Sequence, residues 1–261
     1  MSVLSDKALD GRVVVVTGAA RGIGAGIAEA ALDAGAAVAL LDRDEAAVRE
    51  TARRLDASGK RAFAAGADVT DPASLAAAVA AAARLGTISG WVNNAGIVQM
   101  IPAANLTPEA WRREFDVNAG GVMNGAQAAR RAFAGRGGAI VNIASNAGKV
   151  GFPNMAAYNA SKAAVISLTR SLAREWAAER INVNAVCPGS VATPMLREVA
   201  DQMANELGRS SDQLFAGMVP AQLGRHIRPV EIGRVVVFLL TEAAEIIRGQ
   251  SINLDGGDTP Y

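Results

Sequence analysis

A tyrosine and a lysine stand four residues apart in the stretch YNASK, at Tyr158 and Lys162. In a helix this spacing places both side chains on one face, so the phenol and the ammonium can point into one small volume. Oxidation of an alcohol by hydride removal needs a base for the hydroxyl proton, and the reverse reaction needs an acid. A phenol can act as both if its pKa of about 10 falls toward neutrality, which a nearby cation favours. The pair indicates either an acid–base site or a solvated helix surface.

Two more polar residues could complete such a site. Ser145 ends the apolar run AIVNIAS, thirteen residues before Tyr158, and could orient a substrate oxygen. Asn118 falls inside an expected helix, where asparagine is a poor helix former unless it has another task. It could bind a water that connects Lys162 to solvent. A helix cap or a turn would explain each of the two residues equally well.

Metal and nucleophilic chemistry have little support in the sequence. One histidine and one cysteine cannot build a zinc site of the usual type, and we expect no bound metal. His226 lies beside Arg225 and near Arg228 in an irregular segment, where we expect a solvated loop residue. Cys187 directly precedes a Pro-Gly pair, and we expect a small buried strand residue there.

A glycine-rich segment, TGAARGIGAG, follows the first apolar run, and its glycines have the spacing Gly-x-x-x-Gly-x-Gly. A glycine turn lets the backbone approach a pyrophosphate, and the helix that starts there offers free amides and a positive dipole end. A strand-to-helix turn that needs glycines for packing alone is the alternative. The candidate pyrophosphate contacts are Gly18, Arg21, Gly22, Ile23 and Gly24.

Asp42 ends the second apolar run, eighteen residues after Gly24. A carboxylate at this place can accept both hydroxyls of an adenosine ribose and would repel a 2′-phosphate, which favours NAD over NADP. Arg43 and Arg21 lie close enough in the sequence to receive a 2′-phosphate instead. The alternative for Asp42 is a helix N-cap, a task that Asp44 fits better.

Two later strand ends carry further candidates for the adenine and its ribose. Asp68 and Val69 end the third run, and Asn94 and Gly96 belong to the NNAG that ends the fourth. A strand-end turn would explain either pair of residues as well as a cofactor contact does.

Apolar strands that alternate with helical patterns must position these groups. Continuous apolar strands of this kind indicate a parallel sheet covered on both faces, with the ligand at the carboxyl ends of the strands. We expect helices to begin at Asp71 and Pro72, as N-cap and first helical residue, and to run from about Pro229 to Leu240. The expected strands are residues 12–16, 36–41, 61–69, 90–96, 138–145, 181–189 and 251–257.

Composition and charge narrow the class of protein. The chain has 261 residues, 51% of them apolar and 20% charged, which is typical of a globular protein. The net charge of +1 suggests no nucleic-acid partner. The N-terminus shows no secretory signal and the run VVVFLL is too short to span a bilayer, so we expect a cytoplasmic protein without a membrane partner. With no linker in sight, residues 1–261 form one expected domain, in which the irregular stretch 188–228 covers the substrate.

Taken together, these residues resemble the short-chain dehydrogenase/reductase family in order and approximate spacing, from about residue 11 to residue 257. The resemblance rests on TGAARGIG, Asp42, the Asp68-Val69 pair, NNAG, Asn118, Ser145, YNASK and PGSVATP. It implies an α/β fold, a single Rossmann-type doubly wound domain with a seven-stranded parallel sheet, and a nicotinamide cofactor.

The resemblance also implies a role for each site residue. Tyr158 would be the acid/base, Ser145 would orient the substrate, Lys162 would lower the Tyr158 pKa and bind ribose, and Asn118 would complete a proton relay. Backbone at Gly189 and Val191 and the Thr193 hydroxyl would contact the nicotinamide. The family also implies a homotetramer, paired through two long helices and the C-terminal strand.

The expected activity is NAD-dependent hydride transfer to or from a small-molecule secondary alcohol or ketone. The segment that follows PGSVATP resembles that of bacterial polyol and sugar-alcohol dehydrogenases, and Asn146 and Asn154 suit a hydroxylated substrate. A 3-oxoacyl thioester reductase is the second expectation within the enzyme class. A non-catalytic nucleotide-binding regulatory protein is the alternative outside it, and the intact Tyr158/Lys162 pair speaks against that alternative.

Overall fold

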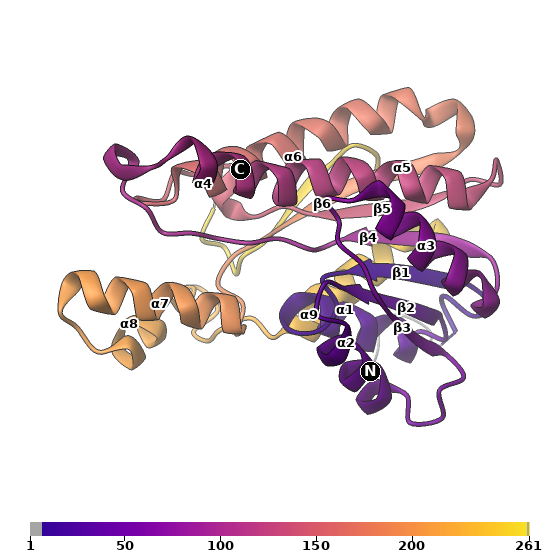
Figure 1. The fold of residues 1–261 in the computed structure, drawn as a ribbon, viewed down its shortest axis with the longest axis horizontal. Helices are drawn as coiled ribbons and strands as arrows, with labels where there is room; N and C mark the ends of the chain where they lie inside the picture. Colours follow the sequence, from indigo (N-terminus) through magenta and orange to yellow (C-terminus); the bar gives the residue numbers. More distant parts are fainter. Residues whose placement is uncertain (1–6, 260) are drawn as a thin grey trace.

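Seven parallel strands form one sheet in the computed structural model, which describes residues 7–259 and residue 261 (Figure 1). The strand order is β3-β2-β1-β4-β5-β6-β7, so the order reverses between β1 and β4, where doubly wound sheets bind their ligands. The seven-stranded Rossmann-type fold expected from the sequence is confirmed. The strands are β1 Val13–Thr17, β2 Ala37–Asp42, β3 Ala62–Gly66, β4 Ile88–Asn93, β5 Gly138–Ile143, β6 Ile181–Pro188 and β7 Ser251–Leu254.

Helices cover both faces of the sheet. Alternate residues of β1 show the two sides: Val14 and Val16 pack with α1, α2 and α9, whereas Val13 and Val15 pack with α3, α5 and α6. Burial on both faces explains why the strands are apolar without alternation. The helices are α1 Gly22–Asp33, α2 Glu45–Leu55, α3 Pro72–Ala82, α4 Pro108–Phe115, α5 Gly121–Phe133, α6 Ala156–Glu175, α7 Pro194–Leu207, α8 Ser211–Gly217 and α9 Pro229–Leu240.

Short-range signals placed the helix starts correctly. The Asp44 side chain accepts a hydrogen bond from the Ala47 amide at the start of α2, and Asp71 caps α3 with Pro72 in its first turn. Among the described residues, no helix is long and apolar enough to cross a membrane. The expectation of no secretory signal concerns in part residues 1–6, which lie outside the described residues.

One segment differs from the sequence expectation, and another agrees with it. The expected helix that contains Asn118 is divided by a π-helical turn, Asp116–Gly120, between α4 and α5. The stretch 188–228 contains α7 and α8, which lie to one side of the sheet layers in Figure 1. Beyond Pro188, which ends β6, this irregular stretch has no strand among the described residues, and Val191 and Ile227 form only an isolated parallel bridge.

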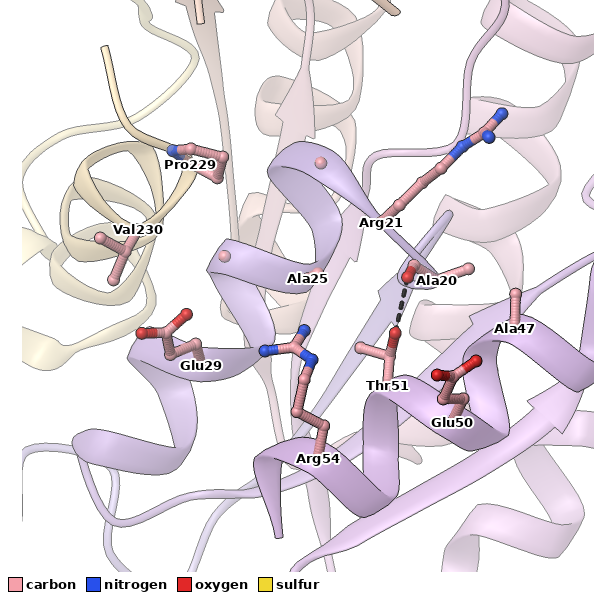
Figure 2. A pocket seen from close by; sticks show the side chains of 12 residues that line it. Ala20, Arg21, Ala25, Glu29, Ala47, Glu50, Thr51, Arg54, Pro229 and Val230 are labelled. Atoms are coloured by element: carbon pink, nitrogen blue, oxygen red, sulfur yellow. Dashed lines mark hydrogen bonds between the residues drawn. The ribbon is translucent and has the colours of Figure 1, made fainter. Parts of the chain in front are cut away.

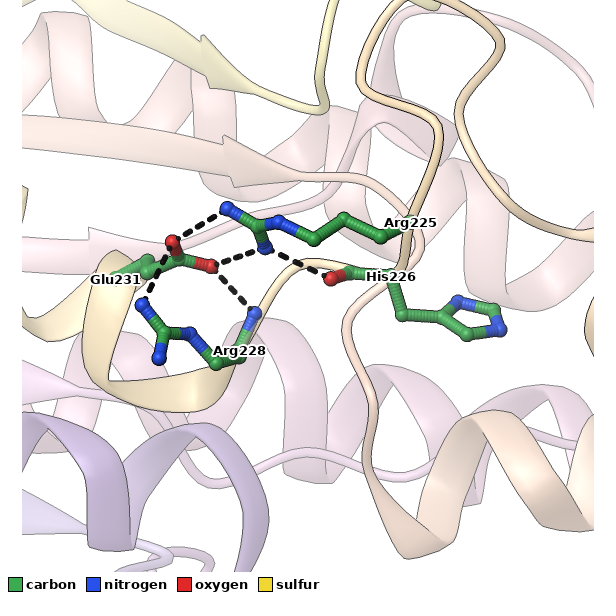
Figure 3. A network of polar contacts seen from close by, with 4 residues as sticks. All are labelled: Arg225, His226, Arg228 and Glu231. Carbon is green, nitrogen blue, oxygen red and sulfur yellow. Dashed lines mark hydrogen bonds and ion pairs between the residues drawn. The ribbon is translucent and has the colours of Figure 1, made fainter.

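The start of α9 is tied to this stretch through Glu231 (Figure 3). The Arg225 guanidinium donates to both carboxylate oxygens at 2.7 and 2.8 Å, and the Arg228 amide donates to Oε2 at 2.8 Å. These contacts, led by the Arg225 hydrogen bond, lower the pKa of Glu231 from 4.5 to about 2. The carboxylate thus both caps the helix and anchors the end of the stretch.

We expect E231Q to lower the free energy of unfolding by about 1 kcal/mol at pH 7, because it loses the paired charge. A carboxylate with a depressed pKa stabilises the fold fully above its unfolded pKa of 4.5, and that stabilisation disappears as the pH falls through about 2. Denaturant unfolding of parent and variant from pH 7 to pH 2 should therefore show a difference that shrinks with acidity. E242Q is the control, since Glu242 pairs with Arg12 on the surface. A difference that is constant with pH would contradict the assignment.

Candidate active site

Tyr158 and Lys162 lie on the first turns of α6 and face the same volume. The Lys162 Nζ atom is 5.7 Å from the centre of the Tyr158 ring. Lys162 is 4% exposed, and its ammonium donates to the Ile143 carbonyl at 2.9 Å. The end of β5 therefore fixes the ammonium beside the phenol.

Asn118 connects α6 to the loop after β4. Its Oδ1 accepts the Ile97 amide at 2.8 Å, and its Nδ2 donates to the Ile97 carbonyl at 2.9 Å and to Ser161 Oγ at 3.0 Å. The Ser161 hydroxyl donates in turn to the Tyr158 carbonyl at 2.8 Å. Asn118 lies in the π-helical turn, an irregularity that often marks functional sites. The residue is fully buried and joins three elements of the site.

Ser145 follows β5 and is 8% exposed. Its Oγ accepts the Ala147 amide at 3.1 Å, so it does cap the short 3₁₀ turn Asn146–Gly148. The same hydroxyl is hydrogen-bonded to Tyr158, where it acts to lower the phenol pKa. Ser145 can therefore be both a cap of the 3₁₀ turn and a residue of the site.

The Tyr158 pKa differs from the sequence expectation. Desolvation of the phenolate raises it to about 12, instead of toward neutrality, and the charge of Glu114 adds to the rise. Burial lowers the pKa of Lys162 to about 8, which weakens the cation that was expected to stabilise the phenolate. Desolvation is the largest cause of both pKa shifts in this structure.

The glycine turn after β1 has the shape of a phosphate cradle. Gly18 and Gly22 adopt left-handed φ values of 64° and 58°. A Cβ atom on Gly24 would lie 2.2 Å from the Gly18 carbonyl oxygen, so no side chain fits there. The first amides of α1 have no intrahelical acceptor, and no side-chain cap bonds them, because the N-cap residue Arg21 has no acceptor atom in its side chain. Residues 18–24, which we call the phosphate turn, therefore have a shape suited to the pyrophosphate of a dinucleotide.

Thr17 and Asn94 stabilise this turn through hydrogen bonds. The Asn94 Nδ2 donates to the Thr17 and Gly18 carbonyls, both at 2.9 Å. The Thr17 hydroxyl accepts the Asn94 amide at 3.0 Å and the Ala95 amide at 3.1 Å. Asn94 thus braces the phosphate turn. Thr17 was not among the residues expected in the site, although its position directly before the first glycine could have signalled it.

Asp42 is held at the end of β2 by two backbone amides. Its Oδ2 accepts the Ala20 amide and its Oδ1 accepts the Asp44 amide, both at 3.0 Å. Asp42 therefore fastens the glycine turn to α2, a role that the sequence did not suggest. Each oxygen keeps a second lone pair that can accept a ribose hydroxyl.

Arg21 and Arg43 offer positive charge near the same strand end. Arg21 is exposed, with its guanidinium 4.0 Å from the Glu198 carboxylate on α7. Arg43 contributes to a lowered pKa of Asp68, after the larger effects of the Thr70 amide and hydroxyl. Both arginines remain accessible to an anionic group at this edge.

The remaining cofactor candidates lie along the same edge of the sheet. The Val69 carbonyl accepts Asn124 Nδ2 at 2.9 Å. A Cβ on Gly96 would lie 3.2 Å from Asn118 Oδ1 and 3.4 Å from Lys162 Nζ, so this glycine lies against the catalytic candidates. Gly189 packs on Asp255, and Thr193 Oγ1 caps α7 through the Leu196 amide at 3.2 Å.

A cavity of about 510 Å³ lies between α1, α2 and the start of α9 (Figure 2). Its wall includes Ala20 and Arg21 of the phosphate turn, and the Thr51 hydroxyl donates to the Ala20 carbonyl at 2.6 Å. Neither Ser145 nor Tyr158 lines it. The cavity borders the turn on its outer side and is separate from the catalytic candidates.

His226 is not the solvated loop residue that the sequence suggested. Both ring nitrogens are buried and lack a hydrogen-bond partner in the described part of the chain. The ring lies 4.3 Å from that of Phe215 on α8, and Figure 3 shows it directed away from the Arg225 and Glu231 contacts. Packing against α8 explains the burial. No group of three or more metal-ligating side chains occurs among residues 7–259 and 261.

Comparison with known proteins covers nearly the whole chain. A family model described as enoyl-(acyl carrier protein) reductase matches residues 18–259. An inactive 2-(S)-hydroxypropyl-CoM dehydrogenase 2 of Xanthobacter autotrophicus is 42% identical over 89% of this chain and 99% of its own. A D-threitol dehydrogenase of Mycolicibacterium smegmatis is 38% identical over 99% of this chain and 97% of its own. The crystal structure of a single-substitution variant of actinorhodin polyketide ketoreductase with NADPH has a TM-score of 0.91 and 34% identity, and covers 96% of this chain and 98% of its own.

Proposed function

Because the chain belongs to the short-chain dehydrogenase/reductase family of oxidoreductases, we propose that it transfers a hydride between NAD(H) and a secondary alcohol or ketone. The convergence of Ser145, Tyr158 and Lys162 beside the buried Asn118 is the observation that carries this proposal. A pure nucleotide-binding protein would have no use for a phenol and an ammonium buried together.

In the oxidative direction, the bound nicotinamide cofactor supplies the hydride acceptor. Tyr158, in its phenolate form, takes the hydroxyl proton of the alcohol on Oη as the hydride leaves the carbinol carbon, so the carbon is oxidised by two electrons to a ketone. Ser145 Oγ holds the same substrate oxygen. The Lys162 ammonium would lower the pKa of the Tyr158 phenol. Ribose hydroxyls that accept hydrogen bonds from Nζ would stabilise the charged ammonium and so strengthen this effect.

We propose a polyol or sugar alcohol as the substrate. The D-threitol dehydrogenase relative supports this class. The polar side chain of Asn146, next to Ser145, also supports it, as does the presence of Asn154 in the segment before α6. The stretch 188–228 would cover the substrate: on α7, Gln202 Oε1 accepts the Met100 amide at 3.3 Å, which brings this helix against the loop after β4. We also propose that residues 1–261 form a single catalytic domain. Four copies of the chain would assemble into a homotetramer in the cytoplasm.

Two other functions have specific support. The description of the matching family model names an enoyl-(acyl carrier protein) reductase, which supports the thioester class of the 3-oxoacyl alternative but not reduction at a 3-oxo group. A non-catalytic role is favoured by the name of the inactive relative. A panel of polyols, simple secondary alcohols and a 3-oxoacyl thioester, assayed with both cofactors by absorbance of the reduced nicotinamide, tests all three. Turnover of polyols supports the proposal, turnover of the thioester alone replaces it, and no turnover at all favours the regulatory alternative.

We propose NAD as the cofactor because of Asp42, whose carboxylate is fixed at the end of β2. In D42S, we expect the ratio of kcat/KM for NADP to that for NAD to rise by about tenfold or more, because the charge that repels a 2′-phosphate is gone and Arg21 and Arg43 remain. The serine hydroxyl can still accept one backbone amide.

D44N is the matched control for D42S, since it removes one charge two residues away and asparagine also caps helices. Its cofactor ratio should equal that of the parent. Steady-state kinetics with both cofactors measures the ratios, and an unchanged ratio in D42S would refute the role of Asp42.

A further inference from the structure

Glu114 is a buried acid that neither the sequence patterns nor the proposed mechanism use. It lies in the last turn of α4, one residue before its end, and is 1% exposed. Its Oε1 accepts the Gln99 amide at 2.8 Å. Buried carboxylates are costly unless they are paired or hydrogen-bonded, so a buried glutamate at this place requires a reason. Its neighbours, not its own helix, supply that reason.

Glu114 and Asn118 together clamp the loop after β4 at two points. Asn118 follows Glu114 by four residues and binds the main chain of Ile97, and Glu114 binds that of Gln99. Gly96, at the start of the same loop, lies against Lys162 Nζ. The clamp therefore fixes the piece of backbone that covers the ammonium, and it ends where Met100 meets Gln202 of α7.

Lys162 is a buried cation, and desolvation lowers its pKa. Among the described residues, the charges that act to raise that pKa are those of the Cys187 thiol on β6 and of Glu114 on α4, and the centre of the Tyr158 ring lies 5.7 Å from Nζ. Cys187 is itself buried, and its pKa is raised by desolvation. Glu114 is the carboxylate among these groups, and its charge acts on both Lys162 and Tyr158.

We propose that Glu114 is a positioning residue of the active site, which serves as the buried counter-charge of Lys162 and holds the loop 97–99 over it. This inference rests on the proposed function, because it assigns Glu114 to the same acid–base pair. The negative charge keeps the ammonium charged in a site where burial would discharge it, and it keeps the proton on the phenol.

The chain contains two tyrosines, Tyr158 and Tyr261, which permits a test that does not need turnover. In a Y261F background, phenolate absorbance reports the ionisation of Tyr158 alone. We expect E114Q to ionise at lower pH than its Y261F parent, by about half a unit or more, because a nearby negative charge has been removed. Glutamine can still accept the Gln99 amide. Circular dichroism at each pH confirms that the fold is intact.

Three further variants complete the spectroscopic test. D116N removes an exposed charge from the neighbouring π-helical turn and should titrate as the parent does. E114D keeps a carboxylate and should also stay near the parent; a downward shift equal to that of E114Q would overturn the role of the charge. An E114Q titration curve that superimposes on that of the parent would also overturn the role of the charge. E114A loses the hydrogen bond as well, so its kcat should be at least several-fold below that of E114Q, and equal values would overturn the clamp.

The pH dependence of kcat/KM extends the test to the reaction. On the acid side of the pH profile of kcat/KM for alcohol oxidation, the rise in rate reports the loss of one proton from the coupled Tyr158/Lys162 pair. This rise should occur at lower pH in E114Q than in the parent. A rise that stays at the same pH would contradict the proposal. If the parent turns over no alcohol or ketone, the proposed function fails, and the absorbance titration still decides the role of Glu114.

Discussion

Y158F is expected to lower kcat for alcohol oxidation by about a thousandfold while leaving NAD binding nearly unchanged. The phenol is hydrogen-bonded to Ser145 and lies beside Lys162, and loss of a general acid–base group costs roughly 10²–10⁴ in rate. Phenylalanine keeps the ring, so the packing of α6 should be preserved. Initial-rate kinetics with the best substrate of the panel, together with NADH titration by fluorescence, separates the effect on chemistry from the effect on binding.

Y261F is the matched control, because it makes the same chemical change at an exposed tyrosine whose hydroxyl donates to the Lys149 carbonyl at 3.1 Å. It should retain the activity of the parent. If Y158F kept more than about a tenth of the activity, another group would have to carry the proton, and the assignment of Tyr158 would be wrong.

The pKa of Tyr158 limits how this chemistry can start. With a phenol pKa of about 12 and a Lys162 pKa of about 8, the site favours the neutral phenol near pH 7. The ketone-reducing direction needs a phenol that donates a proton, which is the form that burial favours. Oxidation needs further stabilisation of the phenolate, which more partners for the Lys162 ammonium would supply.

The fold was predictable because its signals are local and repeated. Continuous apolar runs such as residues 12–16 mark strands buried on both faces, and Asp44, Asp71 and Pro72 mark helix starts through bonds within a few residues. The position of the glycine turn after β1 follows from the same pattern. None of these features depends on contacts between distant parts of the chain.

The features that escaped prediction all depend on such distant contacts. The π-helical turn at Asn118 lies where α4 and α5 pack beside α6, and no residue pattern within 116–120 requires it. The His226 ring, whose nitrogens are buried, packs against Phe215, and the buried Glu114 carboxylate accepts the Gln99 amide. The direction of the Tyr158 pKa shift was wrong because spacing indicates a nearby cation but does not show how much water the site excludes.

The phosphate turn is expected to contribute both to the stability of the fold and to cofactor binding. G24A is expected to destabilise the protein by about 2 kcal/mol or more and to weaken NAD(H) binding by at least tenfold. A Cβ atom at this position would lie 2.2 Å from the Gly18 carbonyl oxygen and 2.6 Å from Asn94 Nδ2. The first of these atoms belongs to the backbone, so relief requires the turn itself to move.

The displacement caused by G24A would reach every group that the turn positions. Asn94 would lose its bonds to the Thr17 and Gly18 carbonyls, and the amides at the start of α1 would shift away from the pyrophosphate. G217A is the matched control, because its Cβ meets nothing within 4 Å and alanine is the better helix former in α8. Denaturant unfolding and NADH titration measure both effects. A G24A protein that binds NADH like the parent would show that this turn does not hold the cofactor, whereas normal stability with lost binding would confine its role to the cofactor.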